Sequence, residues 1–364
     1  MKGRAYTVVI LAAALFIISV SSAPGQLTIR TIDVAGDSIS KGFNAGSAFP
    51  CANADQENYN WLTSNTHGTF FCTAGSENVF SFAERLECDF GTNVFTANPN
   101  HAASGARMLS DFVNQANSIK TYLAGEPAPR LAAVFLGHND NCSGSLTKTN
   151  TSCSSSDLDP GNYCRTKPGA FEREFRKGLE ILMSVPNTRI GVVAPVRVSQ
   201  LCNFGAKSNC QGAGNCQFLW GSVSICGSLT RDCSSTRIID AYTTVKAYRD
   251  ILMQVTAEYA AIPEGGNSRL VVIGGEMVGG ATKAQGTTFL FTDGPWVYKF
   301  NADQLSCCDC FHPSATGQDA LAKLMKNGLD CSRLQPCCKD TGDALTDGKC
   351  GRTETKRFYY RGLF

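Results

Sequence analysis

Short runs of β-branched and apolar residues alternate along this chain with stretches of helical periodicity. The strand-like runs are continuous and bounded by turn residues, which is typical of buried strands. They cover residues 27–35, 92–97, 131–136, 189–194 and 269–273. Helical patterns fill the intervals, at residues 79–86, 108–123, 168–182, 236–262 and 315–329. This alternation predicts βαβ units, and therefore one α/β domain built around a mostly parallel, five-stranded sheet.

The chain contains 18 cysteines among its 364 residues. Cysteine is this frequent mainly where thiols are not kept reduced, so we expect disulfides and an oxidising compartment. Most of the cysteines lie outside the predicted strands, in insertions near residues 141–167 and 201–233, in a cluster at residues 307–310, and in a tail at residues 331–364. Their spacing leaves the pairing open. Zinc binding by the cluster is the less favoured alternative, because a metal site needs thiolates that such a chain would oxidise.

The N-terminus resembles a secretory signal peptide. Lys2 and Arg4 precede an apolar run at residues 8–20, and small residues follow at positions 21–23. This is the order of a charged region, an apolar region and a cleavage zone, and the run is short for a membrane span. We expect residues 1–25 to be removed, although an uncleaved anchor is the alternative. Residues 26–330 then form the folded domain of a secreted or periplasmic protein without a stable membrane span.

The charge of the chain is nearly balanced. Lys and Arg total 33 against 31 Asp and Glu, and 43% of the residues are hydrophobic. That apolar share is sufficient for a sizeable core. A net charge of +2 gives no electrostatic reason to expect a nucleic-acid partner or an anionic membrane surface. The oligomeric state stays open.

Polar residues follow the predicted strands at the points where those strands end. Ser38 follows the first strand, Gly105 the second and Asn139 the third, and Asp309 and His312 precede the last helix. Open parallel sheets bind ligands beyond the carboxyl ends of their strands. We therefore expect these five residues to converge. A serine, a backbone donor, an amide and an Asp/His pair are the groups that ester hydrolysis requires.

Each of these residues has an expected role in that chemistry. Ser38 is the candidate nucleophile, and His312 is the base that takes its proton. Asp309, three residues earlier, would fix the tautomer of the imidazole. The backbone N–H groups of Ser38 and Gly105 and the side-chain amide of Asn139 would form the oxyanion hole. No cofactor and no metal are expected.

Other candidates for the catalytic groups are weaker. His67, His101 and His138 have no carboxylate three residues before them, so we interpret them as structural or pocket-lining. No GxSxG sequence occurs, which excludes the nucleophile elbow of the α/β-hydrolases. In the second insertion, residues 218–220 (Phe-Leu-Trp) either line an acyl groove or lid, or pack as a satellite core under their own disulfides.

Four sequence blocks together resemble the SGNH, or GDSL-type, esterases and lipases. They are GDSI at residues 36–39, NHAASGA at 100–106, GHND at 137–140 and DCFH at 309–312. The resemblance covers roughly residues 27–330, and the DCFHPS sequence with Cys142 is most similar to the phospholipase B branch. Ile39 replaces the usual leucine of the first block, and His138 replaces a residue that is more often small. The resemblance implies a flavodoxin-like, three-layer α/β/α fold and an acyl-enzyme formed on Ser38.

These observations predict a secreted serine esterase or lipase that acts on carboxylic esters. The resemblance implies lipid or phospholipid acyl esters as substrates. A carbohydrate O-acetyl esterase is the alternative within enzymes. A disulfide-rich binding protein on a degenerate hydrolase scaffold is the alternative from another class, and the intact set of Ser38, Asn139, Asp309 and His312 argues against it.

Overall fold

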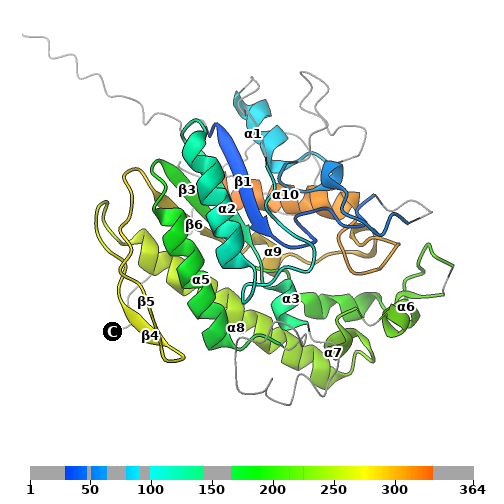
Figure 1. Cartoon of the computed structure of the whole chain (residues 1–364). Helices are drawn as coiled ribbons and strands as arrows, with labels where there is room; N and C mark the ends of the chain where they lie inside the picture. The colour runs from blue at the N-terminus through cyan, green and yellow to red at the C-terminus, as the bar shows by residue number, and fades with distance from the viewer. Residues whose placement is uncertain are drawn as a thin grey trace, which may run out of the picture.

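A computed structural model describes residues 29–46, 51–63, 79–90, 99–142, 165–212, 214–223 and 225–330. At its centre is a four-stranded parallel sheet with the strand order β1-β2-β3-β6. The strands are β1 (Thr31–Gly36), β2 (Arg130–Phe135), β3 (Thr188–Val193) and β6 (Thr288–Thr292). Figure 1 shows that their carboxyl ends point toward α3 (His138–Asn141) and the helices of the second insertion.

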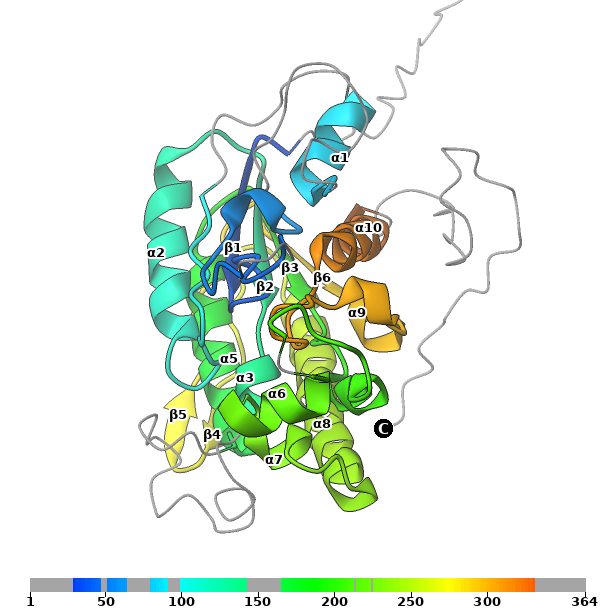
Figure 2. The ribbon, with the colours of Figure 1, turned by 90° about the vertical axis from the view of Figure 1, so that its right-hand side faces the viewer.

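Helices cover both faces of this sheet. One face carries α2 (Phe112–Gly125), α5 (Pro168–Met183) and α8 (Ser235–Ala260), and the other carries α1 (Phe82–Phe90) and α10 (Ala315–Asp330). Figure 2 shows the sheet between α2 and α5 on one side and α1 and α10 on the other. The fold is therefore the predicted α/β architecture with three layers.

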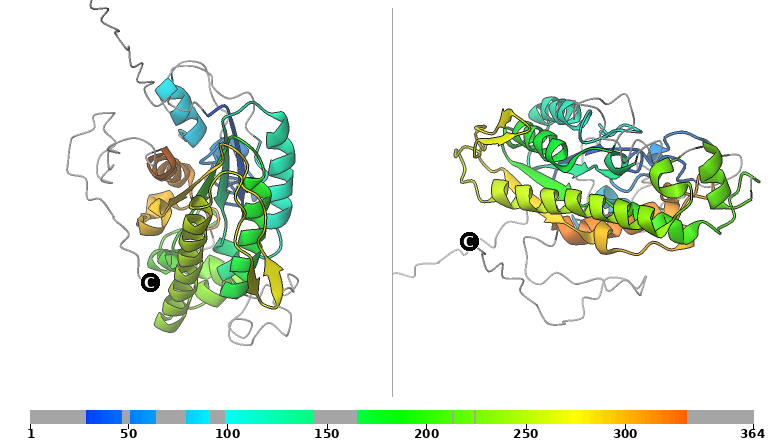
Figure 3. Two further views of the ribbon diagram at one scale, coloured as in Figure 1. Left: turned by 90° about the vertical axis from the view of Figure 1, so that its left-hand side faces the viewer. Right: turned by 90° about the horizontal axis from the view of Figure 1, so that it is seen from below.

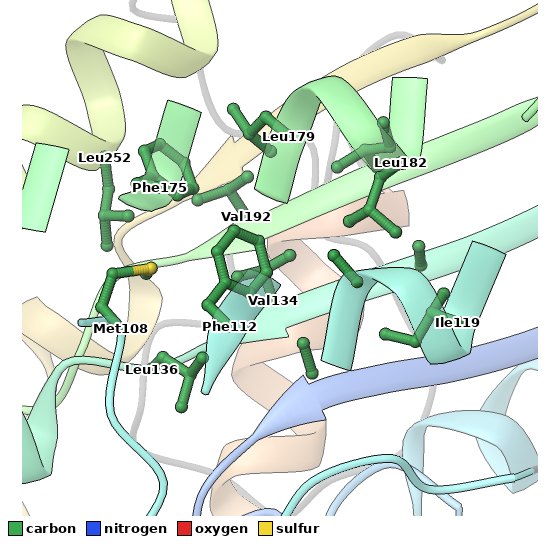
Figure 4. Close-up of a cluster of buried hydrophobic side chains, with 14 of the residues drawn as sticks. Met108, Phe112, Ile119, Val134, Leu136, Phe175, Leu179, Leu182, Val192 and Leu252 are labelled. Atoms are coloured by element: carbon green, nitrogen blue, oxygen red, sulfur yellow. The ribbon is translucent and has the colours of Figure 1, made fainter. Parts of the chain in front are cut away.

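Two apolar clusters hold these layers together. On the first face, the helix side chains of Phe112, Ile119, Phe175, Leu179 and Leu252 pack with Val134 and Val192 of the sheet (Figure 4). On the second face, Phe82, Leu86, Leu321 and Met325 pack with Ile32, Val34, Leu131 and Phe135. The helical spacing of the apolar residues in α5 places them on one buried side, which explains why that pattern predicted the helix.

The last predicted strand forms in part, but it lies outside the central sheet. Residues 271–273 form β4 (Val271–Ile273), which pairs in antiparallel fashion with β5 (Glu276–Val278) in a separate hairpin. This hairpin packs beside α5, away from the sheet (Figure 3), and Lys177 of α5 forms an ion pair with Glu276 at 2.5 Å. Val272 is 68% exposed, so this apolar run is not a buried strand. The predicted strand at residues 92–97 lies outside the described residues.

The fourth strand of the sheet is instead β6, whose sequence TFLFT is flanked by Gly286 and by Asp293, Gly294 and Pro295. Phe291 lies opposite Val192 of β3 in the parallel register. Turn residues on both sides and a high content of β-formers are strand signals. The β-branched run at residues 269–273 gave a similar signal, and only the tertiary packing distinguishes the two.

The second insertion forms a small core of its own above the carboxyl ends of the strands. It contains the 3₁₀ segment η3 (Val198–Phe204), α6 (Cys216–Val223) and α7 (Gly227–Thr230). Leu219 and Trp220 are buried in this third apolar cluster, whereas Phe218 is 65% exposed. Leu219 and Trp220 therefore pack as core residues, in a cluster that extends beyond the insertion to Trp296 and Cys310. The remaining short elements are η1 (Glu57–Tyr59), α9 (Gly294–Val297) and η4 (Ala302–Gln304).

Five disulfides cross-link the described residues. They join Cys51 to Cys308, Cys142 to Cys226, Cys202 to Cys233, Cys210 to Cys307, and Cys216 to Cys310. Disulfides in this number indicate an oxidising, non-cytosolic compartment. Within the ranges that the structure describes, no helix is both long and apolar enough to cross a membrane. The predicted signal peptide and the tail at residues 331–364 lie outside those ranges.

Candidate active site

Ser38 lies in the turn that follows β1. The backbone N–H of Ile39 donates to Asp37 Oδ1 at 3.0 Å, and the N–H of Phe43 donates to the carbonyl oxygen of Ser38 at 3.0 Å. A side chain at Gly36 would place its Cβ 2.3 Å from Ser40 Oγ, so the turn requires glycine there. Ser38 is only 8% exposed, and the turn holds it at the carboxyl edge of the sheet.

His312 lies between Ser38 and Asp309 and contacts both. Its Nε2 is 2.8 Å from Ser38 Oγ, and its Nδ1 is 2.8 Å from Asp309 Oδ2. A carboxylate can only accept hydrogen bonds, so Nδ1 donates to Asp309 and the neutral ring accepts the Ser38 hydroxyl at Nε2. The fold thus brings together residues that are 274 positions apart in the sequence. All three predicted residues converge.

Further donors fix the carboxylate of Asp309. Asn44 Nδ2 donates to Oδ2 at 2.8 Å, and the backbone N–H groups of Phe311 and His312 donate to Oδ1 at 2.9 and 3.0 Å. Burial acts to raise the pKa of Asp309, but the charge and hydrogen bond of His312 and the hydrogen bond from Asn44 outweigh it. The pKa of Asp309 therefore lies below its ordinary value of 3.8, and the carboxylate stays ionised.

The loop that carries Asp309 and His312 is anchored by groups that are distant in sequence. Trp220 Nε1 donates to the carbonyl oxygen of Asp309 at 3.1 Å. Cys307, Cys308 and Cys310 all form disulfides, with Cys210, Cys51 and Cys216. These pairs occupy the sulfur atoms that the zinc alternative would need as thiolates.

No sequence pattern marks Asn44 or Trp220 as part of the site. Asn44 belongs to none of the four sequence blocks, and its left-handed backbone conformation (φ 53°) is visible only in the structure. Trp220 was noted only as a lid or core residue, because its contact with Asp309 spans 89 residues of sequence.

The segments that carry Gly105 and Asn139 meet at the end of β1. Ala103 N–H donates to the carbonyl oxygen of Gly36 at 3.1 Å, and Asn139 Nδ2 donates to the carbonyl oxygen of Ala106 at 3.0 Å. Gly105 is exposed and has φ of +85°, a backbone conformation that favours glycine. Asn139 is half-buried and has a second amide hydrogen beyond the one given to Ala106.

Asp140, the last residue of the GHND block, contacts the segment that follows Gly105. It accepts hydrogen bonds from the backbone N–H of Met108 at 2.7 Å and from Thr166 Oγ1 at 2.6 Å. Burial raises its pKa, and the charge of Arg107 acts in the opposite direction. Asp140 therefore fixes the segment next to Gly105 rather than facing the reacting atoms.

His138 has a structural role, as we expected. It is 2% exposed, its Nδ1 lies 2.7 Å from Asp37 Oδ2, and its Nε2 accepts the backbone N–H of Val196 at 3.0 Å. One imidazole thereby links the ends of β1, β2 and β3. His101 similarly pairs with Asp33 at 2.7 Å, and His67 lies outside the described residues.

An apolar pocket opens beside these residues. It is lined by Ile39, which follows Ser38, and by Phe311 and Pro313, which flank His312. Residues of η3 supply another wall. The pocket is thus lined by direct sequence neighbours of the candidate catalytic residues.

The sequence pattern of the family described as GDSL-like Lipase/Acylhydrolase matches residues 32–325. No curated protein sequence matches the chain significantly. Among solved structures, an extracellular lipase from Streptomyces rimosus is 14% identical, with 82% of this chain and 99% of that chain covered and a TM-score of 0.38. A family 3 carbohydrate esterase from Clostridium thermocellum is 12% identical, with coverage of 82% and 94% and a TM-score of 0.37. The family match extends over most of the chain, and on that ground the protein belongs to the GDSL-like lipase/acylhydrolase family of ester-hydrolysing enzymes.

Proposed function

We propose that the protein is a secreted serine esterase in which Ser38, His312 and Asp309 form the catalytic triad. The observation that carries this proposal is the position of the His312 ring, with Nε2 and Nδ1 each 2.8 Å from Ser38 Oγ and Asp309 Oδ2. A nucleophile, a base and a group that orients the base within hydrogen-bond reach are the requirements of this chemistry.

The reaction has two halves. His312 Nε2 takes the proton of Ser38 Oγ while that oxygen attacks the ester carbonyl, and it then gives the proton to the departing alcohol. The acyl group is left on Ser38. In the second half, His312 takes a proton from water, the resulting oxygen attacks the acyl-enzyme, and the carboxylic acid leaves as Ser38 regains its proton. Asp309 stays ionised and stabilises the imidazolium in both halves.

Each half passes through a tetrahedral intermediate with a negatively charged oxygen. The backbone N–H groups of Ser38 and Gly105 and the second amide hydrogen of Asn139 are the donors that we assign to this oxyanion. Preorganised donors of this kind are usually the largest single contribution to such a reaction. The hydrogen bond from Asn139 to Ala106 supports this assignment because it fixes the orientation of the amide.

Lipid or phospholipid acyl esters are the substrates that we propose. The apolar lining of the pocket beside Ser38 supports them, as does the resemblance of the DCFHPS sequence and Cys142 to the phospholipase B branch. The five disulfides support secretion, because they require an oxidising compartment.

A panel of esters tests this function. The panel consists of p-nitrophenyl acetate, p-nitrophenyl octanoate, a phospholipid and acetylated xylan, each assayed with the wild type, Ser38→Ala and Ser184→Ala. Ser184 is an exposed serine at the end of α5 and serves as the matched control. We expect the octanoate and the phospholipid to be hydrolysed by the wild type and by Ser184→Ala, but not by Ser38→Ala. Turnover of acetylated xylan alone would establish the O-acetyl esterase instead, and no turnover of any ester would refute the proposal.

A further inference from the structure

The pocket beside Ser38 is built almost entirely from apolar side chains. Ile39, Val198, Leu201, Phe204 and Phe311 contribute to its walls. Val198, Leu201 and Phe204 belong to η3, which the disulfide between Cys202 and Cys233 ties to the start of α8. Apolar walls favour a hydrocarbon chain, because each methylene group that leaves water for such a pocket adds to the affinity.

Arg197 is the one permanently charged residue among those that line this pocket. Its side chain lines the same space, yet the guanidinium forms no hydrogen bond and no ion pair with any of the residues that the structure describes. Its Nε is buried without a partner among the described residues, and its guanidinium carbon lies 5.9 Å from the centroid of the Trp296 ring. His138 and Gln200 are the other polar residues that line the pocket, and its lining contains no acidic side chain.

An arginine that borders an apolar pocket and has no protein partner is free to bind a ligand. Arg197 is half-buried, with only its Nε atom fully buried, so its terminal N–H groups are available to an acceptor. The guanidinium is always charged, and its planar fork matches the oxygen atoms of a phosphate or a carboxylate. The cation–π contact with Trp296 uses none of the N–H groups of the guanidinium. These features are those of a binding site for an oxyanion.

We infer that the pocket binds the hydrocarbon chain of an ester substrate while Arg197 binds an oxyanion, phosphate or carboxylate, of the same molecule. The substrate class is then an anionic amphiphilic ester rather than a neutral ester or an acetylated sugar. This inference rests on the proposed function, because it concerns a substrate of the same Ser38 site. It adds a residue, Arg197, that recognises charge, and it predicts a preference that the catalytic triad alone does not produce.

Three esters with the same acyl chain test the charge preference: monodecanoylglycerol, its phosphate, and decanoyl lactate, which carries a carboxylate. A charge-assisted hydrogen bond corresponds to roughly a 10- to 100-fold gain, so we expect the wild type to hydrolyse one anionic ester with a kcat/KM higher than that of the neutral ester by about this factor. The better of the two anionic esters identifies the oxyanion. Arg197→Gln should lose this preference and keep the kcat/KM for monodecanoylglycerol.

Arg269→Gln is the matched control, because Arg269 is exposed and does not line the pocket. It should retain the full preference for the anionic ester. A wild type that favours the neutral ester, or an Arg197→Gln variant that keeps the preference of the wild type, would overturn the assignment of Arg197.

A series of p-nitrophenyl esters tests the pocket itself. From acetate through butyrate to octanoate, kcat/KM should rise by up to about fourfold per methylene group that enters the pocket. Leu201→Trp places a larger side chain in the pocket and should abolish this rise, and far-UV circular dichroism checks that the variant folds. Phe204→Ala enlarges the pocket and should shift the preference toward longer chains. An equal response to chain length in all three proteins would overturn the assignment of the pocket.

The outcomes also separate this inference from the proposed function. If p-nitrophenyl acetate is hydrolysed by the wild type and not by Ser38→Ala, the triad is correct whatever the charge and chain series show. If the wild type hydrolyses none of these esters, the proposed function itself is wrong.

Discussion

His138 Nδ1 lies 2.7 Å from Oδ2 of Asp37, the residue that directly precedes Ser38 in the sequence. The other ring nitrogen of His138 accepts the backbone N–H of Val196, so the imidazole must donate through Nδ1. Asp37 in turn accepts the N–H of Ile39 and thereby shapes the turn around Ser38. His138, which replaces the usual small residue of the GHND block, therefore connects the ends of three strands next to the proposed nucleophile.

His138→Ala should lower the stability and kcat together. The substitution leaves the fully buried carboxylate of Asp37 without its side-chain partner, which costs about 3 kcal/mol in the free energy of unfolding. The turn that carries Ser38 loses a constraint, and a shift of about 1 Å at a reacting group can reduce the rate on the order of 100-fold. Urea unfolding and steady-state kinetics measure the two effects. A variant with the stability and kcat of the wild type would show that the contact is dispensable.

Asn139→Ala tests the oxyanion hole. The substitution removes one donor and leaves Ser38 and His312 in place, so kcat should fall about 10²- to 10³-fold, or roughly 2.7–4 kcal/mol in the activation free energy, with KM little changed. Turnover of p-nitrophenyl octanoate and a thermal unfolding curve are the measurements. Near-full turnover in a normally folded variant would mean that Asn139 only holds Ala106.

Mild reduction should abolish activity before it unfolds the sheet. Three disulfides anchor the loop of Asp309 and His312, through Cys307, Cys308 and Cys310. None of them crosses the apolar clusters between the sheet and its helices, so the secondary structure should persist when they open. Far-UV circular dichroism and turnover of p-nitrophenyl acetate, followed together during a titration with reductant, test this expectation. Simultaneous loss of both signals would mean that the disulfides only stabilise the whole domain.

The low pKa of Asp309 predicts how stability depends on acid. Because the pKa in the folded protein lies below 3.8, the ionised carboxylate stabilises the fold above that pH, and this contribution is lost as the pH falls through the folded-state pKa. Asp309→Asn lacks this contribution at every pH. The difference in the free energy of unfolding between wild type and variant should therefore be largest at neutral pH and should shrink below pH 3.8. A difference that does not change with pH would contradict the ionised state of Asp309.

Local patterns predicted most of the layers but not every strand. The spacing of Phe171, Phe175 and Leu179 is sufficient for α5, because one apolar stripe must face the core. The run at residues 269–273 and the TFLFT sequence of β6 are similar in composition. Only the tertiary structure, in which β6 pairs with β3 and Val272 remains 68% exposed, decides between them.

In the candidate site, too, some residues can be predicted from the sequence and others cannot. Ser38, Asp309 and His312 can be predicted from the sequence, because the sequence blocks that carry them seldom occur together in this order. Asn44 and Trp220 contact Asp309 across 265 and 89 residues of sequence, and an asparagine or a tryptophan in a loop has many other uses. The pairing of the cysteines likewise depends on which loops the fold brings together, which the spacing alone does not specify.

Covalent labelling with an organophosphonate probe tests the central claim, that Ser38 is the nucleophile. The probe mimics the tetrahedral intermediate and reacts only with a serine whose proton a base removes, so His312, 2.8 Å from Ser38 Oγ, should direct it to that residue. Peptide mass spectrometry of the labelled protein should find the phosphonyl group on Ser38, and Ser38→Ala should take up no label and lose ester hydrolysis by several orders of magnitude. Labelling of Ser40 or Ser104 instead, or undiminished hydrolysis by Ser38→Ala, would contradict the account.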